Sequence, residues 1–524
     1  MIFEKTALFC ERLFRILKTM LKALLMSSLT KPERLRLFFE ESGGVFLKLG
    51  QILALRRDLL SVEYTMELLK LLNNIPIEPF HKMNKVFMEE IGEPVDNFFS
   101  SFDYDPIGSA SIAQVYKAVL KNGDNVAVKI QRPGIKEVFE TDFLIISFLA
   151  SVVDLLSFFS ALSAKELVDD LIRWTRKELD FRNESNNAVV FLKYRQEASA
   201  TVIPKQYQEY AHPRVLIQEF IQGGISVLDV VLGKYSRKQL IDKGINLDQM
   251  ALCLLKEGMK EYFIDGFFHA DPHPANLALL PGDKESPDGK LVLFDFGIVG
   301  EAEKENRLIL LRFVYSISVK NIEMMAKYLM EYGKKNLRKE IDRYFQVERG
   351  KQKIVDEIMA KIEGIIISHF KEDIQEIAES WFSVEEDSDA DFKSRSSATF
   401  FLSMVQKADK YGVHFPLDII LFFRGLVIDD MVALQMSPQF DIMKAMEGFF
   451  TEHPVEEVEE KIRNQTNWQE IDKKIVSVND DWESFIESSM WYKEKAMIVR
   501  EKTLEMVFYY AERYPEIKGL ISKL

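Results

Sequence analysis

The sequence predicts an α+β protein with two lobes, a β-rich N-terminal lobe and a large helical C-terminal lobe, and with additional helices at both ends of the chain. Residues 104–130 are rich in strand-forming residues, and residues 215–220 have the pattern of a further strand that leads into a glycine turn. Beyond Gly300 the pattern is almost entirely helical. At 524 residues the chain is long for a single hydrophobic core, so we expect two lobes rather than one.

The composition is that of a folded globular protein and limits the classes of partner. Hydrophobic residues make up 47% of the chain and charged residues 29%. The net charge of −14, without a basic patch interleaved with aromatic residues, argues against nucleic acid as a partner. Two cysteines, Cys10 and Cys253, are too few for a zinc cluster or a disulfide framework. They indicate a reducing compartment, and we therefore expect a cytoplasmic protein.

Residues 1–34 carry apolar residues at helical spacing, such as Leu17 and Leu21, with basic residues such as Lys18 and Lys22 between them. This pattern is typical of an amphipathic helix that lies on an anionic membrane surface. It equally fits a helix that packs on the protein core and leaves its lysines in solvent. Both interpretations remain open at this point.

Residues 35–103 have the pattern of helices and contain a compact signature, Phe46-Leu47-Lys48-Leu49-Gly50-Gln51. Lys48 and Gln51 are the polar residues of this signature. They either cap a surface helix or project a cation and a carboxamide into a site.

A short buried strand, Val126-Ala127-Val128-Lys129, follows a turn and ends in a lysine. This is the form expected of a lysine that contacts the α- and β-phosphates of a nucleotide. Upstream, the residues Gly108, Ser109, Ala110 and Ser111 form a small-residue loop that would allow a close approach of the backbone to phosphates. Only one of them is glycine, so the usual G-x-G-x-x-G pattern is absent. The predicted strand at residues 215–220, which contains Glu219, suits the hinge that contacts adenine.

The acidic partner of Lys129 is less obvious, and the best candidates are Glu178 and Glu184. Glu184 lies 55 residues after Lys129, which indicates an insertion between them. Residues 143–163, within this insertion, form the most apolar window and could span a bilayer by length. A span would place Lys129 and Glu184 on opposite sides of the membrane, so we interpret the window as a buried or membrane-docking helix.

The chain Phe268-His269-Ala270-Asp271-Pro272-His273-Pro274-Ala275-Asn276 is followed by Asp295-Phe296-Gly297. Phosphoryl transfer requires one carboxylate near the attacking hydroxyl, and a carboxamide with a second carboxylate to hold Mg²⁺ against the phosphates. Asp271, Asn276 and Asp295 can fill these roles. His269 and His273 could suggest a zinc site, but the intervening prolines forbid the helix that would place both on one face.

Taken in this order, these motifs resemble the UbiB/AarF/ADCK family of atypical kinases. The resemblance runs from about residue 35 to Asp295 and rests on Lys48-x-Gly50-Gln51, the alanine/serine loop, Glu178-x-Asp180, the catalytic loop and the DFG triplet. Gly108 and Ser109 stand where many members have alanines, and Ala275 replaces a usual glycine. No position with a nucleotide or metal role is lost.

The resemblance implies a protein-kinase-like fold and a role for each motif residue. Lys129 would contact phosphates and pair with Glu184, Asp271 would take the base position, and Asn276 with Asp295 would bind Mg²⁺. The segment that bears Lys48 and Gln51 would fold over the substrate site, facing Glu178 and Asp180. The family is associated with ubiquinone and other prenyl-lipid pathways, and with ATPase activity rather than protein-kinase activity.

We therefore expect an ATP- and Mg²⁺-dependent ATPase, or a phosphotransferase acting on a small or lipid-like acceptor such as a quinone precursor, with peripheral contact to the cytoplasmic face of a membrane. A nucleotide-gated scaffold without catalysis is the alternative. A phosphotransferase of the aminoglycoside-kinase type shares the catalytic loop but does not predict the Lys48 and Glu178 motifs. The expected segments are an amphipathic helix, a helical extension, the two kinase-like lobes and a charged helical tail: residues 1–34, 35–103, 104–220, 221–446 and 447–524.

Overall fold

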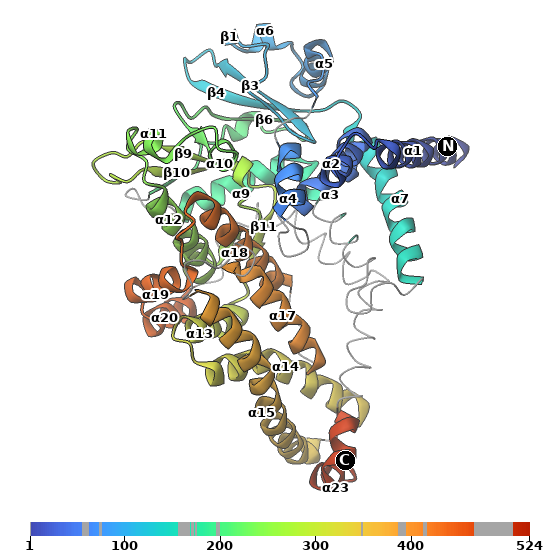
Figure 1. Ribbon diagram of the computed structural model, residues 1–524, viewed down its shortest axis with the longest axis vertical. Coiled ribbons are helices and arrows are strands. Elements are labelled where there is room, and N and C mark those ends of the chain that lie inside the picture. The colour runs from blue at the N-terminus through green and yellow to red at the C-terminus, as the bar shows by residue number, and fades with distance from the viewer. Residues whose placement is uncertain are drawn as a thin grey trace. The chain divides into compact units, whose positions relative to one another are not determined.

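The computed structural model describes residues 2–54, 62–72, 76–155, 168, 172, 175–194, 200–346, 349–385, 395–411, 415, 417–465 and 507–523 (Figure 1). The chain divides into two compact units, of which the first comprises residues 1–253 and 271–299 and the second residues 254–270 and 300–524. The predicted α+β class is confirmed, because the first unit contains two β-sheets and the second is mainly helical. The segment boundaries expected from the sequence stay a prediction.

A five-stranded antiparallel sheet forms the upper part of the first unit in Figure 1. Its order is β1-β3-β4-β6, with β2 also paired to β3. The strands predicted within residues 104–130 and 215–220 are confirmed. The bounds are β1 Ser101–Phe102, β2 Gly108–Ser109, β3 Ala113–Val119, β4 Asn125–Gln131 and β6 Val215–Glu219.

Helices α5 (Phe80–Ile91) and α6 (Val95–Phe98) pack on this sheet. Phe87 of α5 and Tyr116 of β3 are fully buried in the shared core, together with Val128 of β4. Alternate residues of β3 from Gln114 onward are buried because successive side chains of a strand point to opposite faces. In β4 every residue except Asn125 and Lys129 is buried, so both faces of this strand are covered. This core holds β4 in place, and β4 carries Lys129.

A second, four-stranded sheet in the first unit has the order β5-β10-β9-β7. Its central pair, β9 (Leu277–Leu280) and β10 (Lys290–Leu293), is an antiparallel hairpin. The outer strands are β5 (Thr201–Val202), parallel to β10, and β7 (Ile225–Ser226). The neighbouring short helices are η2 Gln208–Tyr210, α10 Val227–Val231, α11 Arg237–Ile241 and η4 Pro274–Asn276.

Helices at the start of the chain pack together within the first unit. They are α1 Ile2–Leu25, α2 Lys31–Ser42, α3 Gly44–Ala54, α4 Val62–Leu69, η1 Lys70–Leu72, α7 Ile135–Leu155 and α9 Phe181–Tyr194. Thr30 and Glu33 form a capping box at the start of α2, which separates it from α1. The segment predicted as one amphipathic helix, residues 1–34, therefore contains all of α1 and the first turn of α2.

The buried side chain of Asp142 on α7 joins three of these helices. Its carboxylate accepts hydrogen bonds from Arg12 of α1 at 2.7 Å and from the backbone N–H of Val45 at 3.0 Å. Val45 lies in the first turn of α3, where backbone donors have no partner within the helix. Asp142 thus fixes both α1 and the start of the helix that carries Lys48.

The second unit consists mainly of helices, as the pattern beyond Gly300 predicts. Helix α12 (Leu247–Lys260) begins in the first unit and continues here into a π-helix, Glu261–Asp265. Strands β8 (Phe267–His269) and β11 (Val299–Glu301) pair with each other. The remaining elements are α13 Lys304–Ser318, α14 Ile322–Tyr344, η5 Arg349–Lys351, α15 Gln352–Glu385, α17 Ser397–Lys410, α18 Leu417–Met436, α19 Ile442–Glu452, α20 Val455–Asn464 and α23 Pro515–Ile521.

Among the helices that the structure describes, none combines the length and the apolar character needed to cross a membrane. The apolar window 143–163 is covered by α7 up to Leu155, and residues 156–163 lie outside the described residues. Within α7, Phe143 and Ile145 are buried whereas Leu144 and Phe148 are exposed. The described part of the window is therefore a helix with a buried and an exposed side.

Candidate functional site

The β9–β10 hairpin brings the two proposed metal-binding residues together. Its register pairs Leu277 with Leu293, so the residues just outside this pair, Asn276 and Phe294, are adjacent. The N–H of Phe294 donates to the carbonyl oxygen of Asn276 at 3.0 Å. Asn276 and Asp295 are therefore held at the same end of the hairpin by backbone hydrogen bonds.

Asp271 lies five residues before Asn276 and is buried. Its carbonyl oxygen accepts the N–H of His273 at 2.8 Å, and the carbonyl of His273 accepts the N–H of Asn276 at 2.9 Å. Pro274 begins the short helix η4 that follows. Two tight turns thus connect Asp271 to Asn276, which explains why these residues keep a fixed spacing.

Lys129 on β4 makes ion pairs with two carboxylates. Its Nζ lies 2.7 Å from Glu184 Oε2 and 3.0 Å from Asp295 Oδ2. Glu184 sits in the first turn of α9 and is buried, whereas the Asp295 side chain is one-third exposed. The Lys129–Glu184 pair that the resemblance implies is present, and Lys129 also reaches the DFG aspartate.

The charges of this cluster shift the pKa of each member. Burial opposes the charge of Lys129, but Asp295 and Glu184 outweigh this effect and hold the lysine pKa above its usual range. Burial also opposes the charge of Asp295 and would raise its pKa. Lys129 and the N–H of Gly297 outweigh this effect and hold the pKa of Asp295 well below the usual range. For Glu184, burial and the charge of Asp295 raise the pKa to about 8. Asp295 is therefore ionised, as a metal ligand requires.

The DFG triplet is held by local contacts that the sequence alone did not assign. The Asp295 carboxylate accepts the N–H of Gly297 at 2.8 Å, and a Cβ on Gly297 would come within 3.0 Å of it. The Phe296 ring packs against Phe191 of α9, and its carbonyl accepts a hydrogen bond from Asn187 at 2.8 Å. Asn187 was visible only as one of two adjacent asparagines after Glu184, without a motif to give it a role.

The small-residue loop is the tip of the β2–β3 hairpin. The N–H of Ala110 donates to the carbonyl of Ala113 at 2.8 Å, which closes the turn around Ser111. Arg132, directly after β4, donates to the Ser109 hydroxyl at 2.7 Å and to the Ala110 carbonyl at 2.9 Å. Sequence reasoning missed Arg132, since nothing in its surroundings distinguishes it from other surface arginines.

Gly108 in the loop and Glu219 at the hinge are two further residues of the site predicted from the sequence. A Cβ added to Gly108 would meet only the side chain of Val115 at 3.9 Å, so packing does not require a glycine there. Glu219 ends β6, and its carboxylate accepts the N–H of Lys205 at 3.1 Å. Its backbone pairs with Val126 of β4, which places the hinge position beside the lysine strand.

The Lys48 motif lies on α3, and Lys48 Nζ is 2.7 Å from Glu178 Oε2. Burial opposes the lysine charge, but the charges of Glu178 and Asp271 raise the pKa of Lys48 above its usual value. Gln51 donates instead to the carbonyl of Leu71 at 3.0 Å. A Cβ on Gly50 would lie 2.7 Å from the side chains of Phe39 and Leu71, so close packing requires the glycine.

Asp180 does not face Lys48, in contrast to what the resemblance implies. Its carboxylate accepts the N–H of Arg182 at 3.1 Å and the guanidinium of the same residue at 2.9 Å. Asp180 therefore caps the first turn of α9, where unpaired N–H groups favour a carboxylate. Although burial opposes it, this pairing lowers the pKa of Asp180. Glu178 and Asp180 are separated by a turn and point to different partners.

The chemistry of the cluster fits Mg²⁺ and does not fit zinc. The carboxamide of Asn276 and the ionised carboxylate of Asp295 are oxygen ligands of the kind that Mg²⁺ prefers, and neighbouring phosphates would supply the rest. Among the described residues there is no group of three or more His, Cys, Asp or Glu side chains that could hold a metal ion by itself. The described residues therefore contain no metal site built from protein ligands alone.

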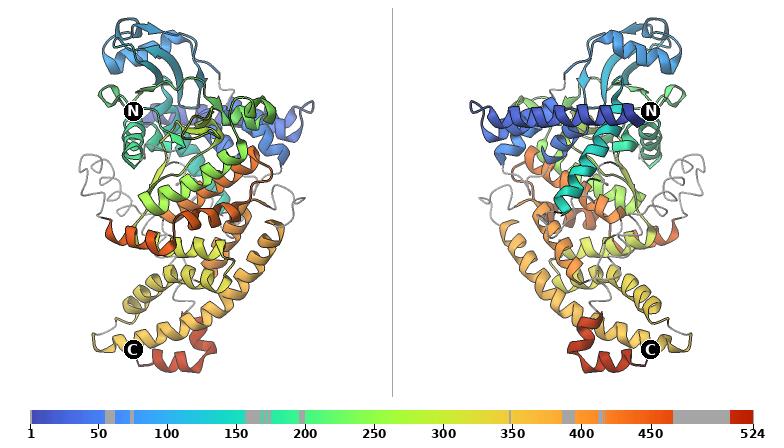
Figure 2. Two further views of the ribbon diagram at one scale, coloured as in Figure 1. Left: turned by 90° about the vertical axis from the view of Figure 1, so that its left-hand side faces the viewer. Right: turned by 90° about the vertical axis from the view of Figure 1, so that its right-hand side faces the viewer.

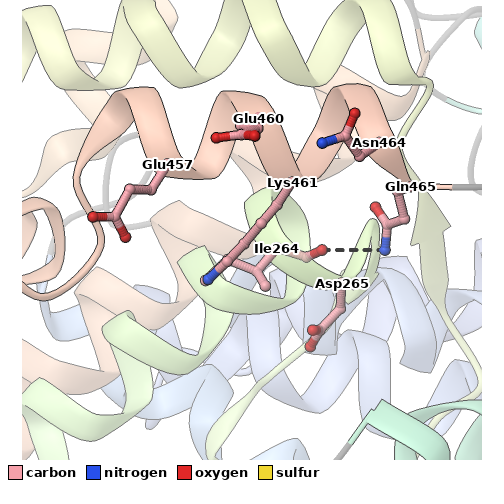
Figure 3. Close-up of a pocket in the computed structure, with 7 residues that line it drawn as sticks. All are labelled: Ile264, Asp265, Glu457, Glu460, Lys461, Asn464 and Gln465. Carbon is pink, nitrogen blue, oxygen red and sulfur yellow. Dashed lines mark hydrogen bonds between the residues drawn. The ribbon is translucent and has the colours of Figure 1, made fainter.

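Neither of two surface pockets among the described residues is centred on the motif cluster. One, of about 730 Å³, lies in the first unit between α7 and the start of α9 and is lined in part by Asp180 and Arg182. The other, of about 630 Å³, lies in the second unit beside α20 (Figure 3). There Gln465 donates to the Ile264 carbonyl at 3.4 Å, and Asp265 points toward the same hollow. The ion pairs of Lys129, and neither of these two pockets, therefore define the candidate site.

Comparison with known proteins assigns the motif cluster to a family. The profile of the ABC1 atypical kinase-like domain matches residues 70–329, about half of the chain. The chain belongs to the ABC1 atypical kinase-like family. The match covers the lysine strand, the insertion, the catalytic loop and the DFG triplet, so the predicted kinase-like fold and the resemblance to UbiB-type kinases are both confirmed.

Relatives of this ABC1 kinase-like protein include an uncharacterized protein and a probable protein kinase. A protein from Clostridium pasteurianum, described as an uncharacterized protein in hydrogenase 1 5'region, is 38% identical over 304 residues, covering 58% of this chain and 54% of that protein. A probable protein kinase UbiB from Marinobacter nauticus is 33% identical over 309 residues, covering 58% of this chain and 54% of that protein. The chain thus spans about half the length of these curated relatives.

A distant structural likeness also exists. The complex of Rv3197 with erythromycin from Mycobacterium tuberculosis has 22% sequence identity and a TM-score of 0.47, covering 76% of this chain and 89% of that chain. A likeness of this degree says nothing about what this chain binds.

Proposed function

We propose that this protein is an atypical kinase-like ATPase that binds ATP with Mg²⁺ and hydrolyses it or transfers the γ-phosphoryl group to a small or lipid-like acceptor. The observation that carries the proposal is the position of Lys129, whose Nζ meets both Glu184 and Asp295. One cation between these two carboxylates is the arrangement that orients a lysine toward nucleotide phosphates beside a metal-binding aspartate.

Each residue of the cluster has a part in this function. Lys129 would donate to the α- and β-phosphates while Glu184 holds its side chain in position. The Gly108–Ser111 hairpin tip would cover the phosphates, with Arg132 fixing its backbone, and the end of β6 at Glu219 would meet the adenine. Asp271 would accept the proton of the attacking hydroxyl or water.

Asn276 and Asp295 would hold Mg²⁺, which supplies positive charge to the phosphate oxygens when it is bound. Their common position at the end of the β9–β10 hairpin supports this assignment. Because the pKa of Asp295 is held well below its usual range, the carboxylate is ionised at every pH at which the protein would work.

The acceptor is proposed to be small or lipid-like because the family resemblance implies that the segment bearing Lys48 folds over the site where a peptide would dock. Lys48 Nζ lies 2.7 Å from Glu178. Although burial opposes the lysine charge, Glu178 and Asp271 raise the pKa of Lys48, so a charged ammonium group interacts with the proposed base. A role in isoprenoid-quinone or other lipid metabolism agrees with the UbiB-type relatives. We place the protein at the cytoplasmic face of a membrane, bound peripherally.

A nucleotide-gated scaffold without catalysis is the second candidate. The same Lys48 favours it, since its ammonium group already interacts with the charge of Asp271, the proposed base. In this case nucleotide binding would alter the conformation of the protein without turnover.

Measurement of ATP hydrolysis by the purified chain with Mg²⁺ tests the proposal, with and without anionic lipid vesicles and a phenolic quinone-precursor analogue. Asp271→Asn should lower turnover by about 100-fold or more while nucleotide binding is kept. Asp295→Asn should abolish turnover through loss of the metal. Asp242→Asn, an exposed carboxylate at the end of α11, is the matched control and should leave turnover unchanged.

Two results would overturn the assignment. Nucleotide binding that raises the melting temperature without turnover, and with Asp271→Asn indistinguishable from wild type, would favour the scaffold. A chain that neither binds nor hydrolyses ATP would leave the kinase-like fold without a nucleotide function.

A further inference from the structure

The outer side of α1 carries a continuous apolar stripe. Phe14, Leu17, Leu21 and Leu24 recur at intervals of three or four residues, so they lie on one side of the helix. Their exposed fractions are 69%, 46%, 56% and 62%, and Leu25 at the end of the helix is 72% exposed. Single exposed apolar residues are common on soluble proteins. Five exposed apolar side chains on one side of a helix, however, form a surface whose contact with water is unfavourable.

The stripe is distinct from the side by which α1 packs on the protein. Ile16 and Ala23 are buried on that inner side, in the core shared with Phe39 and Phe46. Arg12 also points inward, where it donates to the buried carboxylate of Asp142 on α7. These contacts fix the rotation of α1 about its axis, so the stripe cannot turn toward the core to become buried.

A row of positive charge runs beside the stripe. Arg15 and Lys18 are exposed and make no ion pair within the part of the chain that the structure describes. Lys22 continues the row and pairs with Glu41 of α2 at the surface. Among residues 9–25, whose side chains are described, Glu11 is the only acid. The outer side of α1 is therefore apolar with a cationic border, on a protein whose net charge is −14.

Helix α7 adds apolar surface next to α1. The two helices pack together within the first unit, and the right-hand view of Figure 2 shows them next to each other. Leu144 and Phe148 of α7 are 61% and 54% exposed. A surface built on two packed helices is more rigid than a single terminal helix would be.

We propose that the outer side of α1 binds the surface of a bilayer that contains anionic phospholipids, with the helix axis in the membrane plane. An apolar stripe with a cationic border matches the boundary between acyl chains and negatively charged head groups. The charge argues against an interface between two copies of this chain, because two cationic borders would then face each other. The inference rests on the peripheral location proposed above and names the surface that produces it.

Vesicle sedimentation with the full chain tests this inference without any dependence on turnover. Vesicles of phosphatidylcholine with and without phosphatidylglycerol are the probes. Leu17→Glu and Leu21→Glu should each weaken binding to the anionic vesicles by about tenfold or more, because a charged side chain cannot enter the acyl region. Ile241→Glu is the matched control, since Ile241 is 59% exposed on α11, and it should bind as the wild type does.

The charged border is tested separately. Arg15→Gln with Lys18→Gln should reduce binding to the anionic vesicles and weaken its dependence on salt. Lys238→Gln with Lys243→Gln removes two exposed lysines elsewhere and should have a smaller effect. All the changed residues are exposed, so unchanged melting temperatures would show that the variants fold.

Cys10 offers a spectroscopic readout because it is exposed on α1. In a Cys253→Ser chain, an environment-sensitive fluorophore on Cys10 should shift its emission to shorter wavelength when anionic vesicles are added. The proposal would be overturned if the wild-type protein did not bind anionic vesicles. It would also be overturned if Leu17→Glu bound these vesicles as well as Ile241→Glu does. A dimer that Leu17→Glu dissociates, with no vesicle binding, would assign the stripe to self-association. ATP hydrolysis in solution could persist in either case, so the two proposals can fail independently.

Discussion

Lys48 Nζ lies 2.7 Å from Glu178 Oε2, although the two residues are 130 positions apart in the sequence. Both side chains are only 13% exposed. The pair connects α3 to the end of the insertion before α9, close to the charges of Asp271 and Asp295. The contact buries the motif lysine against the insertion instead of leaving it in solvent on the surface of a helix.

Removal of one partner of this pair should destabilise the protein more than removal of both. Lys48→Met leaves Glu178 buried near two other carboxylates, and we expect a loss of about 3 kcal/mol in the free energy of unfolding. Glu178→Gln leaves the lysine without its closest partner and should also destabilise. The double variant should cost less than the sum of the two single variants, as measured by urea unfolding. Additive costs would contradict an energetic coupling between the two side chains.

Gly50→Ala should destabilise α3 through overpacking. The added Cβ would lie 2.7 Å from atoms of Phe39 and Leu71, both of which are buried, and we expect a cost of about 1–3 kcal/mol. Gly364→Ala on α15 is the matched control, because a Cβ there meets nothing within 4 Å. It should stabilise the helix by about 0.5–1 kcal/mol. Thermal unfolding of both variants checks this contrast, and equal effects would refute the packing explanation.

Asp142→Asn should weaken the attachment of α1 and the start of α3. The change removes the charge that holds Arg12 and weakens the hydrogen bond from Val45, for an expected loss of about 2–3 kcal/mol. Lys22→Met breaks the exposed Lys22–Glu41 pair and should cost less than about 1 kcal/mol. Denaturant unfolding compares the two, and proteolysis near residue 25 should increase only in Asp142→Asn. Equal stabilities would show that the buried pair contributes little.

Asp429 should make the stability of the second unit depend on pH. Its carboxyl lies against Gly258 of α12, and burial together with the charges of Glu261 and Asp430 raises its pKa well above the ordinary 3.8. In the unfolded chain the carboxyl loses its proton near the ordinary pKa, whereas the folded protein retains it to higher pH. The free energy of unfolding should therefore be highest below the ordinary pKa and fall as the pH rises through the raised value.

Asp429→Asn removes this titration and should flatten the pH dependence of urea unfolding above pH 3.8, with a more stable protein at neutral pH. Glu447→Gln, at an exposed position on α19, should leave the wild-type slope unchanged. A residual slope is expected because burial also raises the pKa of Asp430 to about 6. If Asp429→Asn kept the full wild-type slope, the titrating group would have to lie elsewhere.

Much of the candidate site could be predicted because its chemistry depends on short spacings. Asp271 and Asn276 are joined by two tight turns, and Asn276 reaches Asp295 through one hairpin register, so a local pattern is enough to identify them. Arg132 and Asn187 could not be found in this way. Their importance comes from hydrogen bonds to the Ser109–Ala110 loop and to the Phe296 carbonyl, and residues of these types are common outside any motif.

The sequence by itself determined the α+β class, the strand that carries Lys129 and the family, because a short apolar run and the spacing of motifs are properties of the local chain. Only the tertiary structure decided between the partners of long-range charges. In the folded protein Lys48 pairs with Glu178, and Asp180 pairs with Arg182. Helix α1 has one apolar side that is packed and another that is exposed. These outcomes depend on which side chains are brought together by packing of distant segments, since a buried charge takes the nearest opposite charge that the fold supplies.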